Sequence, residues 1–249
     1  MSDRLTDRPL NGRIALVTGA TRGIGRAVAL GLAQAGAQVV ATGRTTGALE
    51  ELDDEIRAIG GSATLIPLDL KDGLAIDRMG GALYERFGRI DILIGNAGVL
   101  GDLTPLSHAE AKMWDEVMAI NVTANWRLIR SIEPLLKMSE AGRAMFMTSG
   151  VARVPRAYWG PYAISKAAVE CMVATWVREL TTTRITANLV SPGPMRTKMR
   201  EIAMPGEDPM TLPDPAELVP HVVMMARADF TTTGHIFDFR SKTLKPMVD

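Results

Sequence analysis

The stretch VTGATRGIG, residues 17–25, follows directly on the apolar run IALV at 14–17. Three glycines exceed the one or two that a tight turn needs, so we infer that something approaches this backbone very closely. The apolar run predicts a strand over 13–18, and GIGRAVALGLAQAG predicts a helix over 23–36 with Gly36 as its cap. Backbone N–H groups at the start of such a helix can bind an anion, and we expect the pyrophosphate of a nucleotide to be that anion.

The spacing T-G-x-x-x-G-I-G differs from the common dinucleotide fingerprint G-x-G-x-x-G, and no G-K-[ST] follows that would indicate an NTPase phosphate loop. On this motif alone, a strand-to-helix turn without a ligand stays open. We expect Gly19 to make the turn, and Gly23 and Gly25 to leave room for a ligand and the next strand. The candidate cofactor-binding residues of the turn are Gly19, Thr21, Arg22, Gly23, Ile24 and Gly25.

Apolar strands and amphipathic helices alternate along the rest of the chain. Near-continuous apolar runs are typical of parallel strands that are covered on both faces. The alternation predicts an α/β fold: a doubly wound Rossmann-type sheet of about seven mostly parallel strands with helices on both faces. We expect one domain over 1–249, with 1–11 as a flexible tail and the ligand at the carboxyl ends of the strands. Further strands are expected at 38–42, 63–69, 90–98, 142–149 and 184–193, and helices at 47–60, 71–87, 107–138 and 158–182.

The composition argues against several classes of function. The 249 residues hold 28 basic and 28 acidic side chains, so we expect no nucleic-acid binding driven by net charge. No apolar run is long enough to span a membrane, and the charged N-terminus is not a signal peptide. The single cysteine, Cys171, indicates a cytoplasmic protein without an internal disulfide, and its apolar neighbours predict a buried side chain rather than a nucleophile. The three histidines lie far apart, so we expect no metal site.

The second strand ends in ATGRTT, which places Gly43 and Arg44 where a nucleotide site often has a carboxylate for the ribose 2′-hydroxyl. A carboxylate would repel a 2′-phosphate, whereas a guanidinium binds it through charge-assisted hydrogen bonds. The sequence therefore favours NADP(H) over NAD(H), with Arg22 as a second positive charge. Solvated surface arginines are the alternative for both positions.

The third and fourth strands end in residues that suit the rest of a dinucleotide. Asp69 can accept a hydrogen bond from the adenine amino group while Leu70 packs on the ring, although Asp69 can equally cap the next helix. The small residues of NAG let a cofactor lie across the sheet, and its asparagine can tie neighbouring strand ends together. These candidates are Asp69, Leu70, Asn96, Ala97 and Gly98.

Tyr162 and Lys166 lie four residues apart at the start of a helical pattern, so they face the same way. Ser149 ends the fifth strand, and Asn121 lies upstream in AINVTAN. At this point the sequence strongly resembles the short-chain dehydrogenase/reductase family: T-G-x-x-x-G-I-G, N-A-G, the lone Asn, Ser, Y-x-x-x-K and SPGPMRT follow in the family's order over about residues 12–240. The resemblance implies a catalytic tetrad of Asn121, Ser149, Tyr162 and Lys166.

Physical chemistry supports these roles. Hydride transfer to a carbonyl leaves charge on the oxygen, which must then receive a proton. A free tyrosine has a pKa near ~10, so we expect Lys166 and oxidised nicotinamide to bring the pKa of Tyr162 toward neutrality, for acid–base work in either direction. Ser149 would bind the same oxygen, a contact typically worth ~3 kcal/mol. We expect Lys166 to reach the nicotinamide ribose as well, and the resemblance implies that Asn121 holds a water linking Lys166 to solvent.

The segment SPGPMRTKM is expected to run over the nicotinamide. Pro192 and Gly193 would shape the turn, and the resemblance implies that Thr197 binds the carboxamide. The Pro-, Gly- and Met-rich segment 199–215 predicts a mobile lid over the substrate, with a plain surface loop as the alternative. The C-terminal part lacks the double glycine of most relatives and resembles a bacterial branch of the family called YciK-like.

The candidate pocket residues are mostly apolar, which favours a medium-sized apolar or aromatic carbonyl or alcohol as the small-molecule substrate. Arg153 and Arg156 could bind an acid group of a substrate, but we expect them to be solvated. The apolar faces of helices 107–138 and 158–182 exceed what one sheet face needs, which predicts a homodimer or homotetramer. The pocket candidates are Leu100, Val151, Trp159, Met195 and Met199.

The sequence therefore predicts an NADP(H)-dependent oxidoreductase that interconverts a carbonyl and a secondary alcohol. An NADPH-binding sensor or scaffold without turnover is the alternative from another class, because folds host many functions. An unrelated doubly wound protein, such as a flavin binder, is a third.

Overall fold

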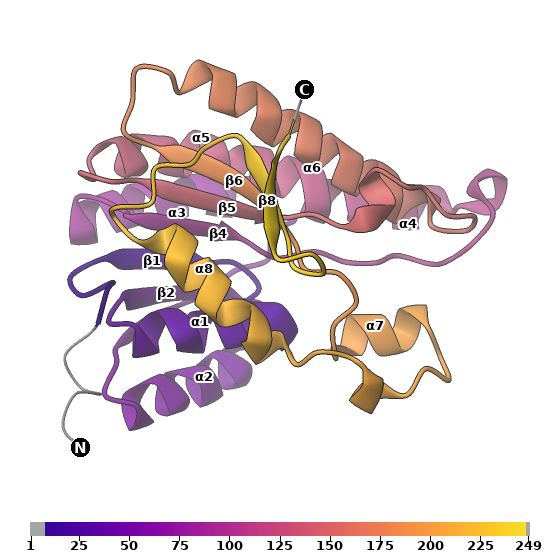
Figure 1. Cartoon of the computed structure of the whole chain (residues 1–249), viewed down its shortest axis with the longest axis horizontal. Helices are drawn as coiled ribbons and strands as arrows, with labels where there is room; N and C mark the ends of the chain where they lie inside the picture. Colours follow the sequence, from indigo (N-terminus) through magenta and orange to yellow (C-terminus); the bar gives the residue numbers. More distant parts are fainter. Residues whose placement is uncertain (1–7, 248–249) are drawn as a thin grey trace.

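The computed structural model describes residues 8–247, which contain one eight-stranded sheet (Figure 1). Its strands are β1 (Ile14–Val17), β2 (Gln38–Gly43), β3 (Ala63–Pro67), β4 (Ile92–Gly95), β5 (Arg143–Met147), β6 (Thr186–Ser191), β7 (His235–Asp238) and β8 (Thr243–Pro246). They lie in the order β3-β2-β1-β4-β5-β6-β7-β8, and only the pair β7–β8 is antiparallel. The order reverses between β1 and β4, which confirms the doubly wound sheet and places the switch point beside the glycine turn.

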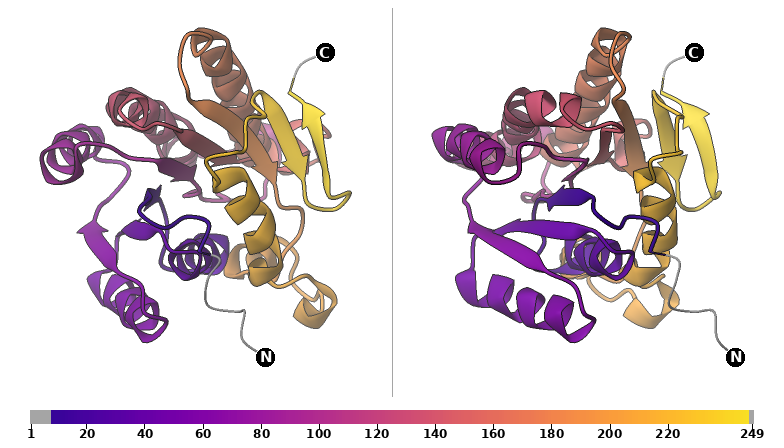
Figure 2. Two further views of the ribbon diagram at one scale, coloured as in Figure 1. Left: turned by 60° about the vertical axis from the view of Figure 1, so that its left-hand side comes forward. Right: turned by 90° about the vertical axis from the view of Figure 1, so that its left-hand side faces the viewer.

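Helices cover both faces of this sheet, as predicted. They are α1 (Gly23–Gln34), α2 (Thr46–Ala58), α3 (Gly73–Phe87), α4 (Ala111–Met118), α5 (Ala124–Lys137), α6 (Gly160–Glu179), α7 (Lys198–Ala203) and α8 (Val219–Ala226). The first face carries α1, α2 and α8, and the second carries α3, α5 and α6 (Figure 2). α4 and α7 lie at the end of the sheet where the parallel strands finish (Figure 1).

Successive strand residues point into opposite layers, which is why the strands are continuous apolar runs in the sequence. In β1, Ala15 and Val17 pack in the core beneath α1, α2 and α8, whereas Ile14 and Leu16 pack in the core beneath α3, α5 and α6. Burial of a Val or Leu side chain stabilises a fold by roughly 1.5–3 kcal/mol. The end of β1 is therefore fixed from both faces, and the glycine turn starts from a rigid base.

The single helix expected over 107–138 is instead interrupted. A 3-10 turn, η1 (Leu106–His108), precedes α4, and a π-helical turn, η2 (Ala119–Thr123), separates α4 from α5. Such π turns insert one extra residue into a helix and occur often at functional sites. The buried Asn121 lies in the middle of η2, where its side chain bonds to groups outside the helix. Those tertiary bonds are not visible in the hydrophobic periodicity.

The structure also bears on the expected burial of Cys171 and on the expected N-terminal tail. Cys171 is exposed, so the expected burial is wrong: on α6 it lies on a different face from the fully buried Val169 and Val173. Residues 1–7 of the expected tail lie outside the described part of the chain. Leu10, within the same expected tail, is fully buried, and its N–H donates to the Ala35 carbonyl at 3.0 Å. Across residues 8–247, no helix is long and apolar enough to cross a membrane.

Candidate active site

The glycine turn brings the ends of β1 and β4 into direct contact. Gly19 has φ +63°, a left-handed conformation, and a Cβ there would lie 3.0 Å from the Ala97 Cα. A Cβ on Gly25 would lie 2.2 Å from the Gly19 carbonyl oxygen, so no side chain fits at that position. Asn96 Nδ2 donates to the Thr18 carbonyl oxygen at 2.8 Å and so ties the two strand ends together, as the sequence suggests. The turn is therefore held close to the sheet, and the start of α1 borders an open groove.

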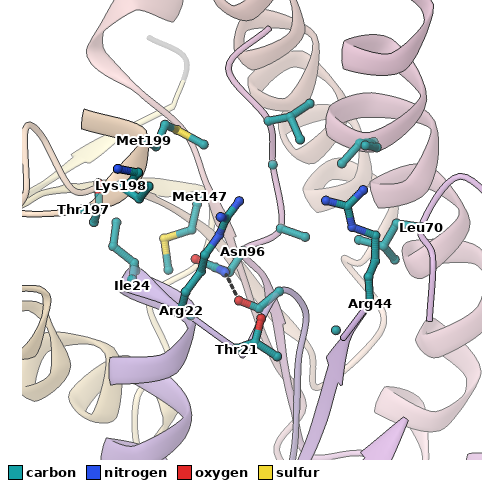
Figure 3. A pocket seen from close by; sticks show the side chains of 18 of the residues that line it. Thr21, Arg22, Ile24, Arg44, Leu70, Asn96, Met147, Thr197, Lys198 and Met199 are labelled. Carbon is teal, nitrogen blue, oxygen red and sulfur yellow. Dashed lines mark hydrogen bonds between the residues drawn. The ribbon is translucent and has the colours of Figure 1, made fainter. Parts of the chain in front are cut away.

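This groove has a volume of about 640 Å³ and runs along the carboxyl ends of the strands (Figure 3). Most of the predicted site residues line it: Gly19, Thr21, Arg22, Gly23, Ile24, Gly25, Arg44, Asp69, Leu70, Asn96, Ala97, Gly98, Tyr162, Lys166, Pro192 and Thr197. Asn121, Ser149 and Gly193 are not among the lining residues. Gly193 instead has φ +68° and lies against the Arg240 side chain.

Several lining residues were not predicted. Ile120 directly precedes Asn121 in η2, and Met147 ends β5 two residues before Ser149, so both were close in sequence to predicted site residues. Val99 extends the NAG segment by one residue. Lys198 is a cation in the quoted stretch SPGPMRTKM, and its charge was the signal available for finding it.

Arg22 and Arg44 extend their guanidinium groups into the same open part of the groove (Figure 3). Both side chains belong to exposed residues, and no ion pair involving either is found among residues 8–247. Arg44 directly follows β2, and Arg22 is the residue before α1. The two guanidinium groups are therefore available to form charge-assisted hydrogen bonds with an anion that enters the groove.

Asp69 also lines the groove. Its Oδ1 accepts from the Lys71 N–H at 2.9 Å. The alternative role as helix cap falls to Asp72 instead, whose side chain accepts from the Ala75 N–H at 2.9 Å. Asp69 is exposed, and Leu70 beside it also lines the groove.

Tyr162 and Lys166 are buried near the start of α6, with 9% and 4% of their surfaces exposed. Lys166 Nζ donates to the Met147 carbonyl oxygen at 2.9 Å and lies 5.7 Å from the centre of the Tyr162 ring. Burial raises the pKa of Tyr162 to about 12, against a smaller lowering from the nearby Ser149 side chain. Burial also lowers the pKa of Lys166 to about 8. In the chain alone, burial disfavours both charged forms and outweighs any effect of Lys166 on the phenol; the predicted lowering of the Tyr162 pKa also involves oxidised nicotinamide and stays a prediction.

Ser149 and Asn121 approach this pair from two other elements. Ser149 follows the end of β5, and its side chain is near enough to Tyr162 to lower the pKa of the phenol slightly. Asn121 Oδ1 accepts from the Val99 N–H at 2.8 Å, and its Nδ2 donates to Ser165 Oγ at 2.9 Å. Ser165 Oγ in turn donates to the Tyr162 carbonyl oxygen at 2.8 Å. Asn121 therefore joins the end of the groove to the helix that carries Tyr162.

Tyr162 belongs to a small apolar cluster that is separate from the two cores of the sheet. It contains Leu100, Val151, Tyr162 and Ala203, with Leu103, Trp159 and Met199 packed against them. Trp159 meets the Tyr162 ring edge-on, with centres 6.1 Å apart. Four of the five predicted pocket residues are in this cluster, but Met195 is not: it is 2% exposed and packs in the core beneath α1, α2 and α8.

The segment after Thr197 folds into short turns held by ion pairs. The Thr197 side chain caps α7 by accepting from the Arg200 N–H at 3.3 Å. Arg200 forms a bidentate ion pair with Glu207: Nε donates to Oε2 at 2.6 Å, and Nη2 donates to Oε1 at 2.7 Å. Arg196 pairs with Asp214 at 2.7 Å. Within residues 8–247, no group of three or more His, Cys, Asp and Glu side chains is placed to hold a metal ion.

Comparison with known proteins agrees with this arrangement. The sequence profile of the short chain dehydrogenase family matches residues 13–208. The chain is 37% identical over 233 residues to the oxidoreductase YciK of Escherichia coli, covering 92% of each. A short chain dehydrogenase of Shigella flexneri, solved in complex with NADP, has a TM-score of 0.91 at 37% identity, over 94% of this chain and 100% of that one. An Escherichia coli short chain dehydrogenase solved with NADPH has a TM-score of 0.91 at 36% identity, over 94% and 99% of the two chains.

The expected resemblance to the YciK branch is thus confirmed. The profile match covers more than half of the chain, and the relative is similar along nearly its whole length. This protein belongs to the short-chain dehydrogenase/reductase family.

Proposed function

We propose that this oxidoreductase transfers hydride between NADP(H) and a carbonyl or secondary alcohol, with Tyr162 as the acid–base group. The observation that carries the proposal is a buried phenol with a buried amine, 5.7 Å from ring centre to Nζ, where the groove meets the apolar cluster. Tyr162 lines the groove and also belongs to the apolar cluster, so its proton donor faces apolar walls. Such a site suits a carbonyl group, because a hydrogen-bond donor polarises the carbonyl oxygen more strongly where water is excluded.

The groove fits a dinucleotide. Gly25 packs directly on the Gly19 carbonyl oxygen, where a Cβ would lie at 2.2 Å, so the glycine turn stays tight and the start of α1 borders the groove with its backbone N–H groups. Arg44 and Arg22 supply two cations for a 2′-phosphate, and similar proteins of Shigella flexneri and Escherichia coli were solved with NADP and NADPH. We therefore assign NADP(H) in preference to NAD(H). When bound, this cofactor supplies or accepts the hydride.

The residues of the chain divide the remaining work. With a pKa of about 12, Tyr162 keeps its proton at neutral pH and can give it to the oxygen that becomes the alcohol. Ser149 binds the same oxygen and fixes its position. Lys166 is assigned to the nicotinamide ribose. A Cβ on Gly98 would lie 3.3 Å from Asn121 Oδ1 and 3.4 Å from Lys166 Nζ, so both atoms border one small space, where we propose that a water relays protons.

The walls beside Tyr162 favour an apolar or aromatic substrate body. Leu100, Val151 and Trp159 present no charge to the reacting group. Arg153 does not serve as an acid-binding group in this proposal, because it pairs with Glu170 at 2.9 Å. Met199 and Ala203 belong to the segment 199–215, which we propose acts as a lid.

We further propose a cytoplasmic homodimer or homotetramer. Apolar side chains remain exposed on and beside α5 and α6, two of the helices that cover one sheet face. Trp126 on α5 is 47% exposed, Met138 directly after α5 is 60% exposed, and Ile164 on α6 is 38% exposed. Large exposed apolar groups on neighbouring helices are typical of surfaces that pair.

Replacement of the phenol tests the central assignment. We expect Tyr162→Phe to lower turnover by about 100-fold or more, because general acid–base catalysis contributes ~10²–10⁴-fold, while NADPH affinity stays nearly unchanged. Turnover is followed as NADPH absorbance over a panel of apolar aldehydes and ketones, and in reverse with alcohols. Tyr84→Phe is the matched control, since Tyr84 is 56% exposed on α3, away from the groove.

Two outcomes would contradict the proposal. Unchanged turnover of Tyr162→Phe on a substrate of the parent protein would remove Tyr162 from acid–base work. Tight NADPH binding by the parent protein without turnover across the whole panel would favour the alternative, a binding protein that does not catalyse.

A further inference from the structure

Glu170 lies on α6, four residues after Lys166, and has no place in the tetrad. Its side chain is only 15% exposed, and both carboxylate oxygens have partners. Thr148 Oγ1 donates to Oε1 at 2.7 Å, and Arg153 Nε donates to Oε2 at 2.9 Å. The Glu170 carboxylate is mostly buried, and each of its oxygens accepts a hydrogen bond. The side chain is therefore held in one orientation, because hydrogen bonds to a charged group are short and directional.

The two partners of Glu170 stand on either side of Ser149. Thr148 directly precedes it, is 2% exposed, and donates its backbone N–H to the Val190 carbonyl oxygen at 2.8 Å. Arg153 directly follows the short turn η3 (Gly150–Ala152) that comes after Ser149. The Glu170 carboxylate, on the same helix as Tyr162, is therefore hydrogen-bonded to both ends of the segment 148–153 that carries Ser149.

Other bonds reinforce the same connection. Lys166, one helical turn earlier on α6, donates from Nζ to the Met147 carbonyl oxygen at 2.9 Å. Arg153 Nη2 donates to the Met247 carbonyl oxygen at 3.2 Å, which anchors the guanidinium to the C-terminal strands. The end of β5 is thus tied to α6 by two successive side chains, Lys166 and Glu170.

We propose that Glu170 is a positioning residue that sets the Ser149 hydroxyl relative to the Tyr162 hydroxyl, acting through Thr148 and Arg153. The inference rests on the proposed function, because it needs Ser149 as the donor to the substrate oxygen. Ser149 and Tyr162 must reach one oxygen at the same time, yet they belong to different elements. A displacement of ~1 Å between such groups can cost ~100-fold in rate, so a direct tie between β5 and α6 has catalytic value.

A double-mutant cycle with Ser149→Ala tests this positioning. In the parent protein we expect Glu170→Ala to lower kcat by about 10-fold or more. In the Ser149→Ala background we expect the same change to lower kcat by less than about 2-fold, because the position of an absent hydroxyl no longer matters. The substrate is a carbonyl compound that the parent protein reduces. The affinity for NADPH, measured by its fluorescence, is expected to be equal in all four proteins.

Conservative variants separate positioning from a loss of folding. Thr148→Val removes the donor to Glu170 and is expected to repeat the loss in kcat, whereas Thr148→Ser keeps a hydroxyl and is expected to recover most of the parent rate. These variants also carry the test if Glu170→Ala does not fold. Glu179→Ala is the matched control, because it removes an exposed carboxylate from the end of the same helix.

The outcomes separate this inference from the proposed function. Equal losses in both backgrounds, or no loss from Glu170→Ala, would overturn the role of Glu170 and leave the role of Ser149 standing. If Ser149→Ala itself leaves kcat unchanged, the assignment of Ser149 in the proposed function fails, and the positioning role fails with it.

Discussion

Lys166 is a cation held almost entirely out of water. Its Nζ has one backbone acceptor, the Met147 carbonyl at 2.9 Å, and burial lowers its pKa from 10.5 to about 8. The unfolded chain would hold this proton up to a pH near 10.5, whereas the folded chain releases it near pH 8. Below pH 8 the folded protein therefore bears the full cost of burying the charge, and this cost falls as the pH rises toward 10.5.

The variant Lys166→Met makes that cost measurable. We expect the free energy of unfolding of the parent protein to rise, relative to the variant, by about 3 kcal/mol between pH 7 and pH 10, since one pKa unit corresponds to about 1.4 kcal/mol. Urea unfolding of both proteins at the two pH values measures the change. Lys112→Met, at an exposed site on α4, is the control and is expected to show no such trend. Parallel pH profiles for Lys166→Met and the parent protein would contradict the buried charge.

The spacing of Tyr162 and Lys166 could be read from the sequence, but their pKa values could not. Burial sets those values, and the cluster over Tyr162 comes from Leu100, Val151 and Ala203, which are distant in the sequence. Cys171 illustrates the same limit: its neighbours in the sequence are apolar, yet the helix turns it toward solvent.

At the scale of elements, we propose that the end of β2 sets the preference of the groove for NADP(H) over NAD(H). Arg44 directly follows this strand and lines the groove, as the sequence predicts. We expect Arg44→Asp to lower the ratio of kcat/KM for NADPH to that for NADH by about 10- to 100-fold, because a hydrogen bond to a charged group contributes about 1.5–3 kcal/mol. Initial rates with the two coenzymes on one substrate give the ratio.

Arg86→Asp makes the same change of charge in the last turn of α3 and is the matched control. Equal kcat/KM for NADPH and NADH in the parent protein would remove the basis for assigning Arg44 to a 2′-phosphate.

Element types were predictable where periodicity is strong and less so where tertiary bonds intervene. The strands β1–β6 all fall within or beside the expected ranges, because each is a largely apolar run between turns. The break at η2 was not predicted, since it depends on bonds from Asn121 to Val99 and Ser165. The link from Glu170 to Thr148 was also invisible, because the two residues meet only once α6 lies against β5.

On the scale of the whole molecule, the sheet order and the two helical layers follow from the alternation of strand and helix. The antiparallel strand β8 was not part of that pattern, because Thr243–Pro246 is short and mostly exposed at the edge of the sheet. The proposed association of chains cannot be predicted from the order of the elements. The feature that supports it is the exposed apolar surface on and beside α5 and α6.

We expect sedimentation at micromolar concentration to give the mass of a dimer or tetramer. Ile164→Asp places a charge on the exposed face of α6 and is expected to shift the mass toward the monomer. Leu74→Asp on α3, at a side chain that is 64% exposed, is the control and is expected to leave the mass unchanged. A monomeric mass for the parent protein would contradict the proposed association.

The π turn η2 makes chain length, and not only residue type, critical at this place. Deleting one residue from Ala119–Thr123 would remove the extra residue of the π turn, so that α4 and α5 could join as one continuous α-helix. The wider turn that places Asn121 between Val99 and Ser165 would then be lost, and the hydrogen bonds of its side chain to these residues would be lost with it. Relatives that share this site should therefore align here without gaps, whereas the surface loops of the fold can tolerate insertions.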